Sequence, residues 1–329
     1  MTTMTDPVPT GKKWLFLGGA GYIGSHVLRE FLAAGETCVV LDNLVTGKVE
    51  RIPPQVELLQ CDATNAENIA AACKSFEITG VVHLAAFMQA RESVADPIKY
   101  WKNNLGVSLA LAKVLNGSGI KHVIFSSSCS VYGNAQNATE VSVFNPISPY
   151  AMTKVASEQV LTQSAAINEV QLTVLRYFNV IGCGEFEKSF DHGNETILPA
   201  AARKITAGVP PVIFGDNFLT KDGSALRDYL DVRDLARAHL LVACRKANLN
   251  PMTMNVSSGR AVSVKEIVST LLDVSGSELT PTIVPSKPGD PSEIWACESP
   301  ELKSLGWNPT YSLYESVLSF WNAFKKSTQ

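Results

Sequence analysis

Short apolar runs alternate with amphipathic stretches along the first half of the chain. Six runs have the length and composition of buried strands, at residues 14–17, 38–41, 56–59, 81–84, 122–125 and 172–175. The spacing between them predicts helices that include residues 65–76, 98–115 and 150–168. Near-continuous apolar strands separated by helices are typical of a parallel sheet covered on both faces. We therefore predict an α/β fold built on a doubly wound parallel (Rossmann) sheet, with ligands beyond the carboxyl ends of its strands.

The pattern changes after residue 176. Residues 182–227 are rich in Gly, Pro and Asn, residues 228–232 and 235–245 return to a strand and a helix, and the tail mixes short helices with prolines. This predicts a second, smaller mixed α/β domain made of discontinuous segments. We expect a nucleotide-binding domain of residues 12–177 plus 228–257, and a substrate domain of residues 178–227 plus 258–329.

A glycine-rich turn follows the first predicted strand. Gly18, Gly21 and Gly24 form G-x-x-G-x-x-G between that strand and a helix. Such glycines allow a tight turn, close approach of the backbone to a pyrophosphate, and packing of helix on strand. Asp42 ends the next strand, at the distance expected of an acid that binds a ribose. Its charge would repel a 2′-phosphate, so the predicted cofactor is NAD rather than NADP.

The candidate catalytic group is Y-x-x-x-K, formed by Tyr150 and Lys154. Residues i and i+4 share one face of a helix, so the phenol and the ammonium are neighbours. A lysine and a positively charged nicotinamide ring favour the phenolate, which makes the tyrosine a usable base. Ser128 belongs to a serine run that follows the fifth predicted strand, and it can relay a proton from a substrate hydroxyl.

Composition narrows the partners. The chain has 329 residues, a net charge of -3 and interspersed charges, which gives no electrostatic case for nucleic acid or a membrane surface. The seven cysteines are scattered singly, without C-x-x-C spacing, so we expect reduced thiols in a cytoplasmic protein and no metal site. No apolar run approaches the length of a membrane span.

These motifs, in this order, resemble the extended short-chain dehydrogenase/reductase family over nearly the whole chain. Further similarities are Cys61-Asp62, the stretch His83 to Ala86 and the pair Asn103-Asn104. The resemblance implies catalysis by Ser128, Tyr150 and Lys154. It also implies cofactor contacts from Gly18, Gly21, Tyr22, Ile23, Gly24, Asp42, Asn43, Asp62, Ala63, Leu84, Ala85, Ala86, Asn103, Ser126, Tyr150, Lys154 and Tyr177.

Within that family, residues 176–182 (RYFNVIG) and 220–229 (TKDGSALRDY) are similar to motifs of the UDP-hexose 4-epimerases. The resemblance implies a UDP-sugar substrate, a homodimer formed through helices near 98–115 and 150–167, and a diphosphate clamp that includes Asn179 and Arg227. The substrate contacts that it implies are Ser128, Phe178, Asn179, Thr196, Arg227, Lys287, Asp290 and Ile294. Three positions depart from the usual epimerase residues, namely Met88 for Lys, Lys287 for Arg, and Thr196 for Asn or His.

The two residues after Ser128 select among the possible reactions. Related 4,6-dehydratases carry an Asp-Glu pair at the positions of Cys129 and Ser130, and related decarboxylases and GDP-mannose dehydratases keep the Glu. Neither residue here is a carboxylic acid. The expected reaction is oxidation of the sugar at C4 to a 4-keto intermediate and reduction from the other face, most simply between UDP-glucose and UDP-galactose. An N-acetylhexosamine, pentose or uronate nucleotide as substrate, a keto-sugar-nucleotide reductase and an NAD-sensing protein stay open.

Overall fold

A seven-stranded parallel sheet forms the centre of the computed structural model, which describes residues 10–186, 188–191, 193, 196–286 and 291–328. Every neighbouring pair in this sheet is parallel. From edge to edge its strands are β11 (Met252–Val256), β7 (Gln171–Tyr177), β5 (His122–Ser128), β4 (Gly80–His83), β1 (Lys13–Leu17), β2 (Thr37–Leu41) and β3 (Glu57–Leu59). The predicted doubly wound α/β fold is confirmed, and its central strands are buried because helices cover both faces.

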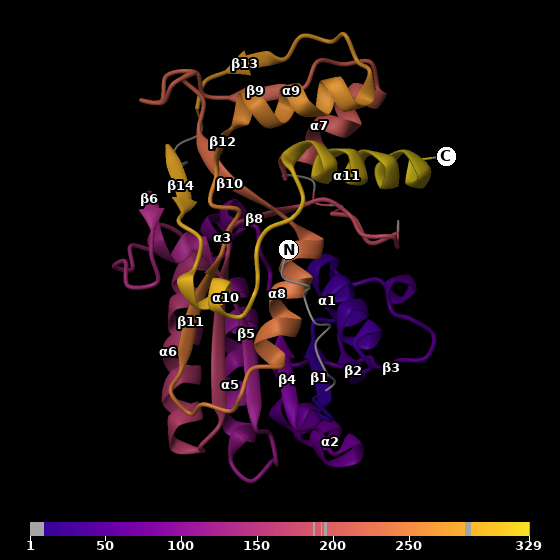
Figure 1. Ribbon diagram of the computed structural model, residues 1–329, viewed down its shortest axis with the longest axis vertical. Coiled ribbons are helices and arrows are strands. Elements are labelled where there is room, and N and C mark those ends of the chain that lie inside the picture. The colour runs from indigo at the N-terminus through magenta and orange to yellow at the C-terminus, as the bar shows by residue number, and fades with distance from the viewer. Residues whose placement is uncertain (1–9, 187, 192, 194–195, 287–290, 329) are drawn as a thin grey trace.

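Two separate apolar layers attach the helices to the sheet (Figure 1). On one face lie α1 (Tyr22–Ala33) and α8 (Val232–Ala243), which also contact each other. On the other face lie α2 (Ala66–Phe76), α5 (Gly106–Leu115) and α6 (Pro149–Ile167). The start of α6 is fixed by Ser148, whose Oγ accepts a hydrogen bond from the Ala151 amide at 3.2 Å, and by Pro149 in the first turn. This start places Tyr150 at the carboxyl edge of the sheet.

The helical stretch predicted over residues 98–115 is present, and the prediction missed only a π turn within it. After the short α3 (Ala90–Ala95), the chain forms α4 (Pro97–Tyr100), a π-helical turn (Trp101–Leu105) and then α5. Asn104 lies in this turn and pairs with the backbone of Phe87, accepting from its N–H at 2.8 Å and donating to its C=O at 2.9 Å. Single π turns inside helices occur mostly at functional sites, and this one adjoins the predicted cofactor site.

A second, mixed sheet joins segments that are distant in sequence. Its strands are β12 (Ala261–Ser263), β10 (Leu226–Asp231), β14 (Glu293–Ala296) and β6 (Ala135–Ala138), with β8 (Asn179–Ile181) paired to the later half of β10. A small pair, β9 (Val212–Phe214) and β13 (Thr282–Val284), lies beside α7 (Ile197–Thr206), α9 (Val264–Ser275) and α11 (Leu313–Thr328) at the top of Figure 1. Three short helices complete the described chain, namely 3₁₀ turns at Val49–Arg51 and Cys129–Tyr132, and α10 (Pro300–Ser304).

The predicted domain boundaries remain a prediction. The two predicted domains interlock, since each contributes strands or apolar side chains to the other. Strand β10 takes in residues 228–231, which the prediction gave to the first domain, and β6 of the first region pairs with β14 of the second. Conversely, Leu302 and Trp307 pack into the apolar layer of α1 and α8. The interlocking places β10 and β14 next to the carboxyl ends of β5 and β7. No helix in the described part of the chain is both long and apolar enough to cross a membrane.

Candidate active site

A cavity of about 580 Å³ lies at the carboxyl ends of β1, β2, β4 and β5. Its walls come from the glycine turn, the end of β2, the loop after β4, the π turn and the end of β5. The structure brings together on this wall most of the residues predicted to bind the cofactor: Gly18, Gly21, Tyr22, Ile23, Gly24, Asp42, Asn43, Asp62, Ala63, Leu84, Ala85, Ala86, Asn103 and Ser126. A doubly wound fold binds its ligand at this edge of the sheet.

The three glycines of the turn have different tasks. Gly18 has φ +84°, and a Cβ there would lie 2.7 Å from the backbone nitrogen of Ala85. A Cβ on Gly24 would lie 2.4 Å from the carbonyl oxygen of Gly18, so this glycine lets α1 pack on the turn. A Cβ on Gly21 would come no closer than 3.4 Å to the protein, so the protein itself does not demand glycine there. Gly21 lines the cavity, and the space beside it suits a pyrophosphate.

The start of α1 supports the same interpretation. Gly21 is its N-cap and offers no side chain to the first N–H groups, and the first turn contains no acidic residue. These N–H groups and the positive end of the helix dipole form an anion site that fits a pyrophosphate. The residues present therefore fit a dinucleotide.

Asp42 is buried at the end of β2 and holds the loop around the cavity. One carboxylate oxygen accepts from the Ala20 amide at 2.9 Å, and the other accepts from the Leu44 amide at 2.9 Å. Each carboxylate oxygen can accept a further hydrogen bond, so ribose hydroxyls can share this group. The negative charge disfavours a phosphate on the 2′ oxygen of this ribose, which NADP carries and NAD lacks.

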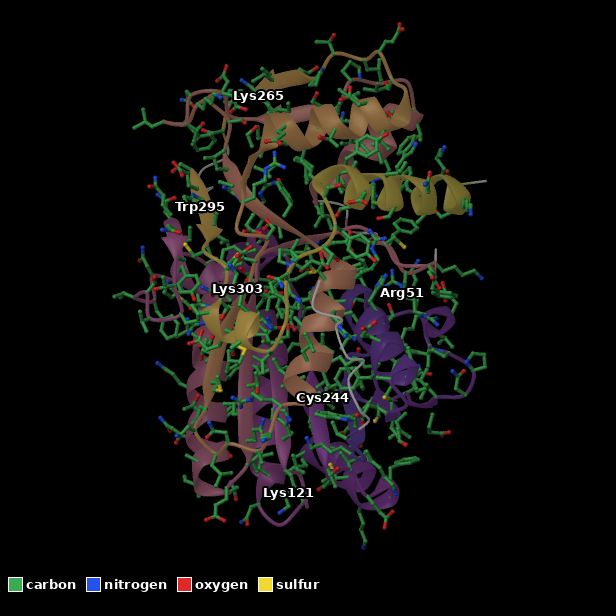
Figure 2. The ribbon with its side chains drawn as sticks, in the orientation of Figure 1. Arg51, Lys121, Cys244, Lys265, Trp295 and Lys303 are labelled. Atoms are coloured by element: carbon green, nitrogen blue, oxygen red, sulfur yellow. The ribbon has the colours of Figure 1, made fainter. Side chains whose placement is uncertain are left out.

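Arg51 is a cavity residue that the sequence analysis missed. It is buried, and its guanidinium donates to the carbonyl oxygens of Phe190 at 3.1 Å and Lys188 at 3.4 Å. Figure 2 shows Arg51 beside α1, where it joins the cavity wall to the segment that contributes Asp191 and Gly193. The local sequence around Arg51 does not indicate this long-range contact.

Tyr150 and Ser128 meet at the end of β5. Burial raises the pKa of Tyr150 to about 12, and a hydrogen bond with Ser128 opposes that rise. Ser128 Oγ also accepts from the Ser130 amide at 3.2 Å, which holds this serine at the start of the 3₁₀ turn. The phenol is therefore protonated unless a positive charge is added close to it.

Lys154 is buried one helical turn beyond Tyr150. Its Nζ donates to the carbonyl oxygen of Ser126 at 2.7 Å and lies 6.0 Å from the centroid of the Tyr150 ring. Burial lowers the pKa of Lys154 to about 8, with Glu158 opposing the fall. The hydrogen bond of the lysine thus goes to the strand, and its ammonium lies beside the phenol ring.

Tyr177 adjoins the other predicted cofactor residues through a hydrogen bond with Ser126. Its ring is buried in the layer that contains α8, its hydroxyl pairs with His239 Nε2, and it does not line the described cavity wall. Burial raises the pKa of Tyr177 well above its usual range.

Four of the residues predicted to bind substrate, Phe178, Asn179, Arg227 and Ile294, lie together on the side of Cys129, whereas Thr196 contacts Gly193 on the cofactor cavity wall. Phe178 and Ile294 pack in one small cluster with Cys129. Ile294 is paired in register with Arg227, whose guanidinium donates to the carbonyl oxygens of Leu226 at 2.7 Å and Pro291 at 2.8 Å. Asn179 hydrogen-bonds Tyr229, and Thr196 is the N-cap of α7. Lys287 and Asp290 lie outside the described residues.

Comparison with known proteins agrees with this geometry. Residues 14–257 match the NAD dependent epimerase/dehydratase family. The chain is 36% identical over 313 residues to the UDP-glucose 4-epimerase of Lacticaseibacillus casei, covering 93% of this chain and 95% of that protein.

Two solved structures are similar throughout. One is the UDP-glucose 4-epimerase of Bifidobacterium longum in complex with NAD⁺ and UDP (TM-score 0.89, 28% identity, 96% of this chain and 99% of that one). The other is the UDP-glucose 4-epimerase of Stenotrophomonas maltophila with bound NAD and formylated UDP-arabinopyranose (TM-score 0.89, 29% identity, 96% and 99%). With the family match covering most of its length, this chain belongs to the NAD-dependent epimerase/dehydratase family.

Proposed function

We propose that the protein is an NAD-dependent 4-epimerase that interconverts UDP-glucose and UDP-galactose. The observation that carries this proposal is the buried group of Ser128, Tyr150 and Lys154 beside a cavity that fits a dinucleotide. The similarity of the whole chain to UDP-glucose 4-epimerases supports the choice of sugar nucleotide.

NAD would be held by the glycine turn, the start of α1 and Asp42. When bound in its oxidised form, it supplies a hydride acceptor and a positive charge. The other tasks belong to the chain. Tyr150 takes the proton of the C4 hydroxyl and later returns it, Ser128 relays it through the hydrogen bond that the two side chains share, and Lys154 adds a second positive charge.

Inversion at C4 also requires that the hexose turns while the UDP part stays bound. We infer that Asn179, Arg227 and Phe178 hold the UDP part on β8 and β10, and that Ile294 borders the sugar. Arginine suits a diphosphate because its planar fork donates two hydrogen bonds at once. Holding the distant part of the substrate firmly is what allows the reacting part to be loose without being lost.

The residue after Ser128 favours epimerisation over elimination. Cys129 is buried, and burial raises the pKa of its thiol to about 12. A thiol held neutral in this way cannot serve as the carboxylic acid that removal of water from the sugar requires. The reaction that remains is removal and return of a hydride at C4, with inversion of that carbon.

We also propose a cytoplasmic homodimer. Leu109 on α5 and Met152 on α6 are 50% and 43% exposed, and these two helices lie side by side. Apolar side chains on adjacent surface helices are typical of a subunit interface. None of the seven cysteines, all of which lie in the described part of the chain, forms a disulfide, which suits a reducing compartment. Sedimentation that shows a monomer at micromolar concentration would count against the dimer.

A panel of nucleotide sugars separated by chromatography tests the activity. The expected result is that UDP-glucose and UDP-galactose, supplied separately, reach one common ratio. UDP-N-acetylhexosamines are expected to react weakly. Conversion of another UDP-sugar with neither of these two would replace the proposed substrate, and no conversion of any would overturn the proposed reaction.

A further inference from the structure

A second set of charged side chains lies beneath the catalytic group and takes no part in the proposed proton transfer. Glu158 follows Lys154 by one helical turn on α6, and Arg176 lies on β7 next to the end of β5. Ser127 directly precedes Ser128. Arg176 is paired in register with Ser127, and all three residues are buried.

Glu158 and Arg176 form a two-pronged ion pair. Arg176 Nε donates to Oε1 of Glu158 at 3.0 Å, and Nη2 donates to Oε2 at 2.7 Å. Their side chains are only 7% and 5% exposed. Ser127 Oγ donates to the same carboxylate. The carboxylate is thus held in one orientation from two strands.

The far side of Arg176 is equally fixed. Its Nη1 donates to the Tyr132 hydroxyl at 2.8 Å and to the Glu140 carbonyl oxygen at 3.0 Å. The Tyr132 hydroxyl in turn donates to Asn255 Oδ1 at 2.7 Å. Because desolvation largely cancels the attraction in a buried pair, such an arrangement is weak as a source of stability. Its position under the site suggests another use.

The pair acts on the site through charge. Burial lowers the pKa of Lys154, and Glu158 is the group that opposes this fall and keeps the ammonium form. Three further titratable groups lie around Tyr150 and Lys154, and burial favours the neutral form of each. It lowers the pKa of His83 on β4 to about 3, raises that of Cys129 to about 12, and raises that of Tyr177 well above its usual range. Asp228 on β10, whose pKa burial raises to about 7, lies beyond Cys129 and is unchanged in all the variants that test the pair.

We propose that Glu158 and Arg176 are a positioning pair for the catalytic group, which fixes α6 against β5 and β7 and sets the charge balance under Tyr150 and Lys154. This inference rests on the proposed reaction only for its kinetic readout. Removal of the negative charge makes proton loss easier at both Tyr150 and Lys154, and removal of the positive charge makes it harder. The two single variants therefore act in opposite directions.

The kinetic test is the pH dependence of kcat in Glu158→Gln and Arg176→Gln. Both limbs of the profile are expected to move to lower pH in Glu158→Gln and to higher pH in Arg176→Gln, each by roughly one pH unit. Arg176→Lys keeps the charge and should leave the limbs in place. Glu30→Gln, which removes a carboxylate from the ion pair with Arg237 between α1 and α8, is the control away from the site and should move nothing.

A second readout does not depend on any substrate. With lysine labelled at Cε, the carbon NMR signal of Lys154, assigned by its loss in Lys154→Met, reports the titration of this side chain directly. The pKa read from this signal should be lower in Glu158→Gln and higher in Arg176→Gln than in the parent protein, even if the proposed reaction is wrong. If a single variant does not fold, the double variant Glu158→Gln, Arg176→Gln leaves no unpaired charge, and its titration should stay within about half a unit of the parent protein.

Limbs that stay in place while kcat falls uniformly would show a merely structural pair and overturn the proposal. The proposal would also be overturned if the limbs moved in the same direction in both single variants. It would be overturned as well if the Lys154 titration of the double variant shifted by more than that of either single variant.

Discussion

Tyr150 is the residue on which the proposed reaction depends most. Its phenol is buried, shares a hydrogen bond with Ser128 and has a pKa raised to about 12, so it needs positive charge nearby to act as a base. The sequence motif predicts this tyrosine and its lysine correctly as neighbours. It does not predict that the Lys154 ammonium is hydrogen-bonded to the Ser126 carbonyl, because that contact depends on how α6 docks against β5.

Replacing Tyr150 by Phe removes the base and keeps the ring. Loss of a general base typically lowers a rate by about 10²–10⁴-fold, and we expect epimerisation to fall by at least this much. Cofactor content, measured by absorbance after denaturation, should stay that of the parent protein. Near-normal turnover of the variant is the result that would remove Tyr150 from this role.

Asp42 holds the loop around the cavity and is also predicted to select NAD over NADP. Two substitutions can separate these roles. Asp42→Ala removes the acceptors for the Ala20 and Leu44 amides together with the charge. Asp42→Asn removes the charge and keeps one oxygen. Both should weaken NAD binding and relax discrimination against NADP, and the Ala variant should also lower the midpoint of thermal unfolding. Calorimetric titration with each nucleotide checks this, and equal affinity of the parent protein for NADP and NAD would contradict the assignment.

Ile294 offers a test of sugar selection. It packs with Phe178 and Cys129 and is paired with Arg227, so its side chain borders the predicted substrate site. We expect Ile294→Tyr to abolish weak activity on acetamido sugars and Ile294→Ala to raise it. Such changes in pocket size are usually worth about 1–3 kcal/mol. An unchanged ratio of activities on the two sugar classes in both variants would show that residue 294 does not touch the sugar.

At the scale of elements, the glycine turn and α1 were predictable because local sequence fixes them. The π turn before α5 was not, since it depends on the pairing of Asn104 with Phe87, which lies 17 residues earlier in the chain. The doubled asparagine was the only signal. Strands β6, β8 and β14 were also missed, because each is short and is stabilised by partners that the sequence does not place beside it.

Two glycine variants separate folding from cofactor binding. Gly24→Ala places a Cβ 2.4 Å from the Gly18 carbonyl oxygen, so α1 must shift, and we expect a loss of about 1–3 kcal/mol in the free energy of unfolding. Gly21→Ala meets only a 3.4 Å contact, so it should unfold like the parent protein.

Because Gly21 faces the cavity, Gly21→Ala should instead weaken NAD binding. Urea unfolding without added nucleotide and titration with NAD give the two quantities. Equal losses of NAD affinity and stability in both variants would show that the two glycines have one common role.

At the scale of the whole molecule, the sheet order and the edge that carries the site follow from the strand–helix alternation. The interlocking of the two regions does not. Arg51 reaches Phe190, and β10 pairs with both β8 and β14, so the cavity wall and the predicted substrate side are built by segments far apart in sequence. Charge, length and motif spacing carry no information about such contacts. For this reason the sequence does not indicate that Arg51 and the Glu158–Arg176 pair belong to the site.

In the proposed reaction one retained cofactor takes the hydride from C4 and returns it, and Tyr150 takes and returns the hydroxyl proton. The most direct test incubates the purified protein with UDP-galactose and no added nucleotide, and follows UDP-glucose by chromatography and free NADH by absorbance in the same sample. We expect many turnovers to UDP-glucose per protein chain and no NADH in solution. One NADH released for each sugar oxidised, with turnover that stops unless NAD is added, would contradict this expectation.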